Sequence, residues 1–185
     1  MTIALDQETD KALKAWIKAE KRRQRRTAAA YFARHQEEAE TPAGRAAIRA
    51  RILAAARARR ADGRLLDSRD AAVIEAIRLE LERRGIDPAN PPEVPEGTDV
   101  SGRWAGTTNR GTGPSITAHI PSAYFRAVTA AAWQISGDAV TELRERWPGG
   151  RPGGSASDDY LELAEQVVTP GDIYRAAIEA LTAEP

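Results

Sequence analysis

The sequence lacks cysteine and has few aromatic residues and few long apolar runs. Without Cys among its 185 residues, the chain has no disulfide bonds, thiolate metal sites or cysteine nucleophiles. Aromatic residues make up only 5% of the chain, so the core must be built from Ala, Leu, Ile and Val. No apolar run reaches the roughly 18 residues of a membrane-spanning helix. Residues 1–14 also lack the pattern of a signal peptide. We therefore expect a cytoplasmic protein that does not bind membranes.

Residues that commonly carry catalysis or bind metals are scarce and scattered. The chain has two histidines, His35 and His119, and neither has a hydroxyl or carboxylate at the spacing of a known motif. The glycines of residues 102–113 are not followed by the Lys and Ser or Thr of a phosphate-binding loop. Asp158 and Asp159 stand where a helix is expected to begin, a position in which acidic side chains stabilise the helix dipole. The sequence thus disfavours an enzyme and predicts no metal and no cofactor.

Charge is distributed unevenly along the chain. The totals cancel, with 27 Lys and Arg against 27 Asp and Glu. Residues 11–60, however, hold 15 basic and 4 acidic side chains, a net charge of +11. Residues 61–100 carry a net charge of −5 and residues 101–185 a net charge of −3. Such segregation favours a polyanionic partner.

Apolar spacing and capping signals predict a mainly α fold. A first helix is expected over residues 6–40, although no apolar stripe crosses its basic middle. Thr41 followed by Pro42 predicts a second helix over residues 42–61, with Ile48, Ile52, Leu53 and Ala56 on its buried side. A third helix, capped by Asp67 or Ser68, is expected to end at Arg84, before Gly85.

A segment rich in proline and glycine divides the sequence. Residues 86–114 contain five prolines and five glycines, which argues for a linker or an irregular lobe. We therefore predict a basic helical module over residues 1–85 and a helical domain with one short N-terminal strand over residues 115–185. Trp104 is unusual in a linker and is expected to hold the segment against a neighbour.

The second part begins with the clearest strand pattern in the chain, SITAHI, over residues 115–120. Its apolar residues alternate with polar ones, which predicts one buried and one exposed face. Helices are then expected over residues 122–135, 138–147 and 158–168. A last helix should run to about residue 181, with Thr169 and Asp172 forming a capping box at its start.

The basic stretch is the first indication of a nucleic-acid partner. Lys and Arg neutralise phosphates and release counterions, which gives affinity that does not depend on base sequence. Two other interpretations stay open, an acidic partner protein and a solvated face that contacts nothing. The candidate contacts are Lys18, Lys21, Arg22, Arg23, Arg25, Arg26, Arg45 and Arg49.

The second indication is the order of strand and helices from residue 115 onward, which resembles the opening of ribbon-helix-helix DNA-binding proteins. The resemblance implies an obligate dimer whose two strands pair antiparallel and enter the major groove. It implies that the polar positions face the bases and that the apolar positions form the shared core. The implied base-facing residues are Ser115, Thr117 and His119, and the implied dimer-core residues are Ile116, Ala118 and Ile120. The family favours Arg, Lys, Asn or Gln on its ribbon, and this strand carries none.

The second helix of that motif has two candidates. Residues 137–143 follow at ordinary loop length, whereas residues 169–175 fit the pattern better but require a long insertion. In either case the resemblance implies that the first amides of this helix bind a phosphate. Because no second strand pattern is visible in the chain, pairing between two copies is the simplest way to satisfy the strand's backbone.

These observations together favour a DNA-binding accessory or regulatory protein, of the repressor, partition or conjugation accessory type. The alternative is a helical assembly or interaction subunit, such as a phage structural component, whose basic helix docks on an acidic partner. The basic segment and the ribbon-like pattern support the first hypothesis. The second needs only the charge segregation.

Overall fold

The computed structural model describes residues 2–96, 98, 104–106, 115–149 and 158–183. These residues form a mainly α structure with six α-helices, one 3-10 turn and two strands of three residues each. Much of the proline- and glycine-rich segment 86–114, including 99–103 and 107–114, lies outside the described residues. No helix among the described residues is both long and apolar enough to cross a membrane.

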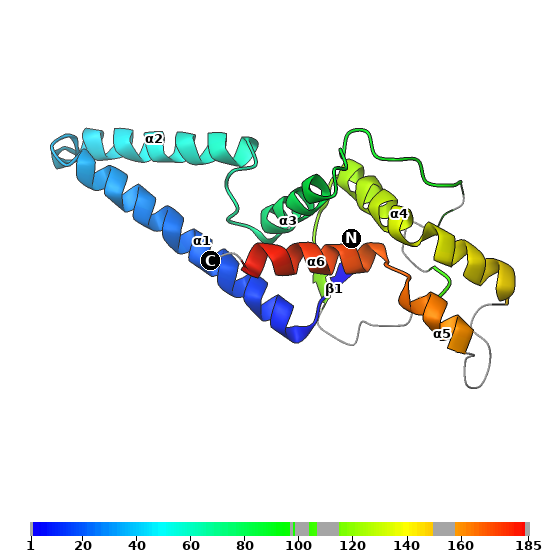
Figure 1. Cartoon of the computed structure of the whole chain (residues 1–185). Coiled ribbons are helices and arrows are strands. Elements are labelled where there is room, and N and C mark those ends of the chain that lie inside the picture. Colours follow the sequence, from blue (N-terminus) through cyan, green and yellow to red (C-terminus); the bar gives the residue numbers. More distant parts are fainter. Residues whose placement is uncertain (1, 97, 99–103, 107–114, 150–157, 184–185) are drawn as a thin grey trace.

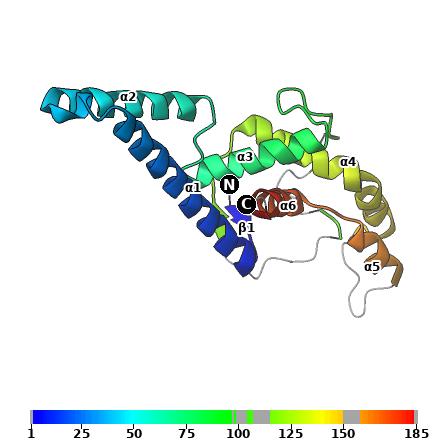
Figure 2. The same cartoon turned by 60° about the vertical axis from the view of Figure 1, so that its left-hand side comes forward.

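Two helices and the turn between them form a projecting V (Figures 1 and 2). Helix α1 (Gln7–Arg34) leads into a 3-10 turn, η1 (Glu38–Glu40), and helix α2 (Pro42–Ala61) returns toward the rest of the chain. The predicted continuation of the first helix to residue 40 is wrong, because the chain must reverse direction before α2. The predicted bounds of the second helix are confirmed. We call residues 18–61 the arm and the remaining described residues the body.

Capping side chains explain where these helices begin. The carboxylate of Asp6 accepts a hydrogen bond from the Thr9 amide at 2.8 Å, and the Thr41 hydroxyl accepts one from the Gly44 amide at 3.0 Å. Both satisfy amides that the first turn of a helix leaves without a partner. Gly44 also lies so close to η1 that an added Cβ would stand 1.6 Å from the Glu38 carbonyl oxygen. The vertex of the V therefore requires glycine at this position.

The body contains the hydrophobic core. Helix α3 (Arg69–Arg83) packs against α6 (Pro170–Ala183) and α4 (Ser122–Arg146), and α5 (Asp158–Glu165) packs on α4. The first half of α1 joins the core through Leu13 and its contacts with α6. Residues from both sides of the predicted domain boundary, such as Ile77 and Leu143, lie in one cluster. The described residues before and after this boundary therefore share one core, and Trp104 is buried in it, against Trp133.

Helix α4 corrects the prediction of two helices over residues 122–147. It runs without a break through Ser136 and Gly137. The Ser136 side chain is fully buried, donates to the Val168 carbonyl at 3.0 Å and accepts from the Val168 amide at 2.6 Å. This use of Val168 also explains why α5 ends at Glu165 instead of residue 168. Ile135, close to the predicted break, is 46% exposed.

The strand of residues 115–117 has a partner within the chain. Strand β1 (Thr2–Ala4) pairs antiparallel with β2 (Ser115–Thr117), and Ile3 lies opposite Ile116 with both residues 2% exposed. The expectation that the chain offers no second strand is therefore wrong. Strand β1 was missed because three residues before the Asp6 cap are too few to show an alternating pattern. The argument for strand pairing between two copies no longer holds. The dimer itself stays a prediction.

Candidate nucleic-acid interface and interhelical groove

The structure brings the predicted basic residues together on the arm. Those of α1 are all exposed, Arg49 is exposed on α2, and Arg45 is half-buried near the vertex. Because the arm projects from the body, these side chains lie on a surface that the core does not cover (Figure 2). The α1 members of this set are Lys18, Lys21, Arg22, Arg23, Arg25 and Arg26.

Only two of these cations are engaged within the arm. Arg23 lies 3.3 Å from the carboxylate of Glu20, which is itself buried and also accepts from Gln24 at 3.1 Å. Arg45 donates to the carbonyl oxygens of Ala39 at 2.8 Å and Glu40 at 3.1 Å, so its guanidinium stabilises the vertex. The other six form no ion pair with a described residue. Their charge is therefore available to an external anion.

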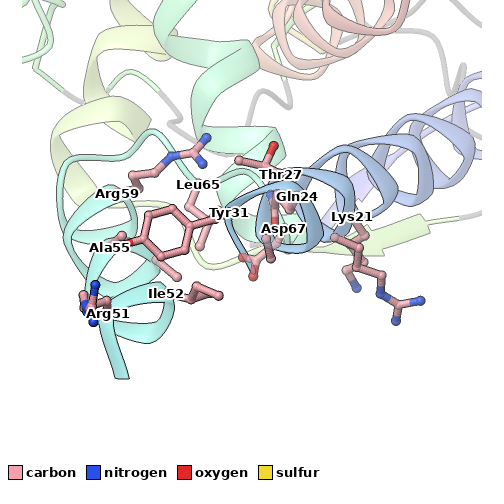
Figure 3. A pocket seen from close by; sticks show the side chains of 13 residues that line it. Lys21, Gln24, Thr27, Tyr31, Arg51, Ile52, Ala55, Arg59, Leu65 and Asp67 are labelled. Atoms are coloured by element: carbon pink, nitrogen blue, oxygen red, sulfur yellow. The ribbon is translucent and has the colours of Figure 1, made fainter. Parts of the chain in front are cut away.

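Between the two helices of the arm lies an open groove with a volume of about 560 Å³ (Figure 3). Tyr31 extends from α1 toward Ile52 and Ala55 of α2, and Leu65 closes the end nearest the body. The helices diverge from the vertex, so their side chains do not fill the space between them. Its apolar lining residues are Ala28, Tyr31, Ile52, Ala55, Ala56 and Leu65.

Basic side chains surround this apolar floor. Lys21 and Arg25 approach from α1, and Arg51 and Arg59 approach from α2. The Tyr31 hydroxyl, and then the Glu38 carboxylate, raise the pKa of Arg51 above its usual value, so this guanidinium stays charged. The groove thus combines an apolar centre with a cationic rim.

The predicted buried side of α2 is less buried than expected. Of the four residues expected on its buried side, Ile48 is fully buried, Ile52 and Ala56 are half-buried, and Leu53 is 57% exposed. Ile48 is the only described residue of α2 that is fully enclosed. Apolar spacing located the inner face of the helix, but it could not show that most of this face has no partner.

The ribbon face has the predicted alternation. Ser115, Thr117 and His119 are exposed, whereas Ile116 and Ala118 are buried. Ile120 is half-buried. The alternation is therefore confirmed for the strand itself, and its apolar side faces the core of the same chain.

Two side-chain contacts bring the ribbon and the base of the arm close together. The His119 ring lies 3.1 Å from Asp70 of α3, and Arg60 of α2 lies 2.7 Å from Asp67, at the start of the same helix. The two predicted binding features thus meet near the N-terminal end of α3. Nothing in the sequence indicates this proximity, since His119 and Asp70 are far apart along the chain.

The structure decides only in part between the two candidates for the second helix of the predicted motif. Residues 137–143 lie inside α4 and cannot begin a separate helix. At the start of α6, Thr169 and Asp172 form the predicted capping box, with the Thr169 amide donating to Asp172 at 2.8 Å. Pro170 has no amide hydrogen, and the amides of Asp172 and Ile173 both donate to Thr169, so few amides at this helix start are available to a phosphate.

The described residues hold no group of three or more His, Cys, Asp or Glu side chains placed to bind a metal ion. His35 stacks on Tyr31 with ring centroids 4.3 Å apart, and its Nδ1 lies 2.9 Å from the Tyr31 carbonyl oxygen. This histidine therefore packs at the C-terminal end of α1.

No family model, curated protein or solved structure matches the chain.

Proposed function

We propose that the protein binds DNA as an accessory or regulatory protein, with the outer face of the arm contacting phosphates. The observation that supports this most directly is the set of exposed α1 cations without an internal ion pair. Because neighbouring charges repel, such a cluster is stabilised by an external polyanion. Phosphate binding of this kind is independent of base sequence and weakens steeply as salt rises.

The length of the basic stretch suits a row of phosphates. Residues 18–26 rise about 12 Å along the helix axis at about 1.5 Å per residue. Phosphates of one DNA strand recur every 3.4 Å or so along the duplex axis. Several basic side chains can therefore contact neighbouring phosphates at once. The exposed ribbon residues Ser115, Thr117 and His119 would supply contacts to base edges, because a two-stranded ribbon fits the major groove.

Binding to duplex DNA at several salt concentrations tests this function. Arg22 and Arg26 do not line the groove, so the double variant Arg22→Gln/Arg26→Gln removes charge from the outer face alone. We expect weaker binding to every sequence and a log–log salt slope smaller by about 1.8, at roughly 0.9 per phosphate contact.

A matched control removes two exposed arginines of the body, as Arg126→Gln/Arg144→Gln, and should leave affinity and slope nearly unchanged. Fluorescence anisotropy with a random 24-base-pair duplex measures both. Equal losses in the two variants would show that only overall charge matters. An unchanged slope in the arm variant would show that these side chains do not contact phosphates.

The groove favours a second candidate function, a helical interaction subunit that docks on an acidic partner protein. DNA would contact the outer face through residues such as Arg22 and Arg26, whereas a protein partner would enter the groove; among the α1 cations the two surfaces share Lys21 and Arg25.

A further inference from the structure

We propose that the groove between α1 and α2 binds an acidic amphipathic helix of a partner protein. This inference does not depend on DNA binding: Lys21 and Arg25 belong to both sets of cations, but Arg22 and Arg26, which test DNA binding, do not line the groove. Three features of the arm support it: the lack of packing around α2, the shape of the groove and its charge.

Helix α2 lacks the packing that normally stabilises a helix. Its 20 residues are capped at the start, but within the described structure it packs mainly against η1 at the vertex. Most helical stability in proteins comes from packing an apolar face against other elements. The apolar face of α2, with Ile52, Ala55 and Ala56, points into the groove and meets no filled core. An added helix would complete this layer.

The floor of the groove has room for large apolar side chains. Three of its residues, Ala28, Ala55 and Ala56, are small, whereas Tyr31 and Leu65 provide larger apolar surfaces at the sides. A partner helix can place Leu or Ile over the alanines at spacings of three and four residues. This arrangement is the helix-in-groove mode of recognition.

The rim selects for negative charge on the flanks of that helix. Four cations, Lys21, Arg25, Arg51 and Arg59, line the groove; Arg51 is already paired with Glu38, and the other three form no ion pair with a described residue. The one lining carboxylate, Asp67, is paired with Arg60. Complementary charge steers association and disfavours basic partners. A nucleic acid would match this rim, but its phosphates would gain nothing from the apolar floor. An acidic amphipathic helix matches both.

A second copy of the chain fits less well. The acidic helix of this chain, α5, already buries Tyr160 and Ala164 in the body. To enter the groove of another copy, α5 would have to leave that core. The geometry therefore points to a helix from a different protein.

The test uses the full-length protein and a synthetic 18-residue peptide with Leu on one helical face and Glu on both flanks. Two further peptides serve as controls, one with the same residues in scrambled order and one with Lys in place of Glu. We expect the acidic amphipathic peptide to bind in the micromolar range and both controls to bind at least about tenfold more weakly, which is a difference of about 1.4 kcal/mol.

Two variants of α2 locate the binding surface. Ala55 lines the groove, whereas its neighbour Ala54 does not, and both are exposed, so glutamate at either position should not unfold the chain. Ala55→Glu should weaken the peptide at least about tenfold, and Ala54→Glu should change it little. Circular dichroism checks that both variants stay helical.

Several results would overturn the proposal. They are no binding of the acidic peptide to the wild type, equal losses in the two variants, and equal binding of the scrambled peptide. DNA binding that Ala55→Glu abolishes and Ala54→Glu does not would assign the groove to nucleic acid. A wild-type dimer that Ala55→Glu alone dissociates, measured by light scattering, would assign it to a second copy. Arg22→Gln/Arg26→Gln should leave peptide binding intact, so failure of the DNA proposal is seen separately.

Discussion

Helices α2 and α4 are both rich in alanine, yet they use it in opposite ways. In α4 the alanines at 127, 130, 131, 132 and 139 are buried and allow neighbouring elements to approach closely. In α2 nearly every alanine is exposed or half-buried, and arginines are interspersed between them. Alanine forms a helix in either setting, because it loses no side-chain entropy. The comparison shows that an alanine-rich segment can form a helix without being buried. Helix α4 in the body is both helical and buried, whereas α2 is helical only.

The largest expected effect is in the body. Ile77→Ala removes a fully buried side chain from the cluster shared by α3, α4 and α6, and it should destabilise the protein by about 2–5 kcal/mol. Leu53→Ala on the arm is the counterpart, because that side chain is 57% exposed. It should change stability by no more than about 0.5 kcal/mol. Urea unfolding followed by circular dichroism compares them, and similar losses would mean that Leu53 is packed.

A smaller effect in the body depends on pH. Burial opposes ionisation of Asp172, but hydrogen bonds from Thr169 and the Arg175 ion pair outweigh it and lower its pKa below 3.8. Its ionised form therefore stabilises the fold above the unfolded pKa, and that contribution is lost as pH falls through the folded pKa.

Asp172→Asn should then cost about 1 kcal/mol at pH 7, because it removes the charge from a capping box. The cost should shrink as the pH falls through the lowered folded-state pKa of Asp172, because the wild type becomes protonated there too. Asp138→Asn, at an exposed position of α4, should show neither effect. A cost that stays constant from pH 7 to pH 3 would contradict this role of Asp172.

The smallest effect on overall stability should come from the vertex. Gly44→Ala places a Cβ where the Glu38 carbonyl oxygen stands, so η1 and the first turn of α2 must move apart. We expect faster amide hydrogen exchange in residues 38–50 and an unchanged thermal transition of the body. Gly63→Ala is a useful comparison, since its Cβ would meet no atom within 4 Å, although its positive φ of 68° still disfavours alanine. A large drop in the main transition of Gly44→Ala would show that arm and body unfold together.

The sequence predicted the fold most accurately at helix starts that carry a recognisable capping residue. Thr41 with Pro42, and Thr169 with Asp172, marked the starts of α2 and α6 correctly, because those hydrogen bonds form within one turn. The mainly α class followed from the same periodicity. The α4 break predicted near Gly137 was wrong, because Ser136 bonds to Val168 and holds the helix in place from outside. That contact spans more than 30 residues of sequence and has no local sign.

The sequence identified basic residues of the candidate site, but not how the two helices of the arm are arranged around the groove. The basic residues of α1 were identified from the sequence, and the structure places them together on the arm. The groove was not identified, because its residues come from two helices and the connection after them. Apolar spacing places Ile52 on the buried side of its own helix, but it cannot show that α1 and α2 diverge. Strand β1 was missed for a similar reason, since three residues define no period.

Helix α1 belongs to both parts of the molecule, and this gives the arm a mechanical property. Its 28 residues span about 42 Å as one rod, anchored in the body at Leu13 and joined to α2 at the vertex. Helix α2 leads back to the body, where Arg60 pairs with Asp67. The two helices and the body thus form the three sides of a triangle (Figure 1). A displacement of the vertex would therefore be felt at two separate places in the body, at the contacts of α1 with α6 and at the Arg60–Asp67 ion pair beside α3.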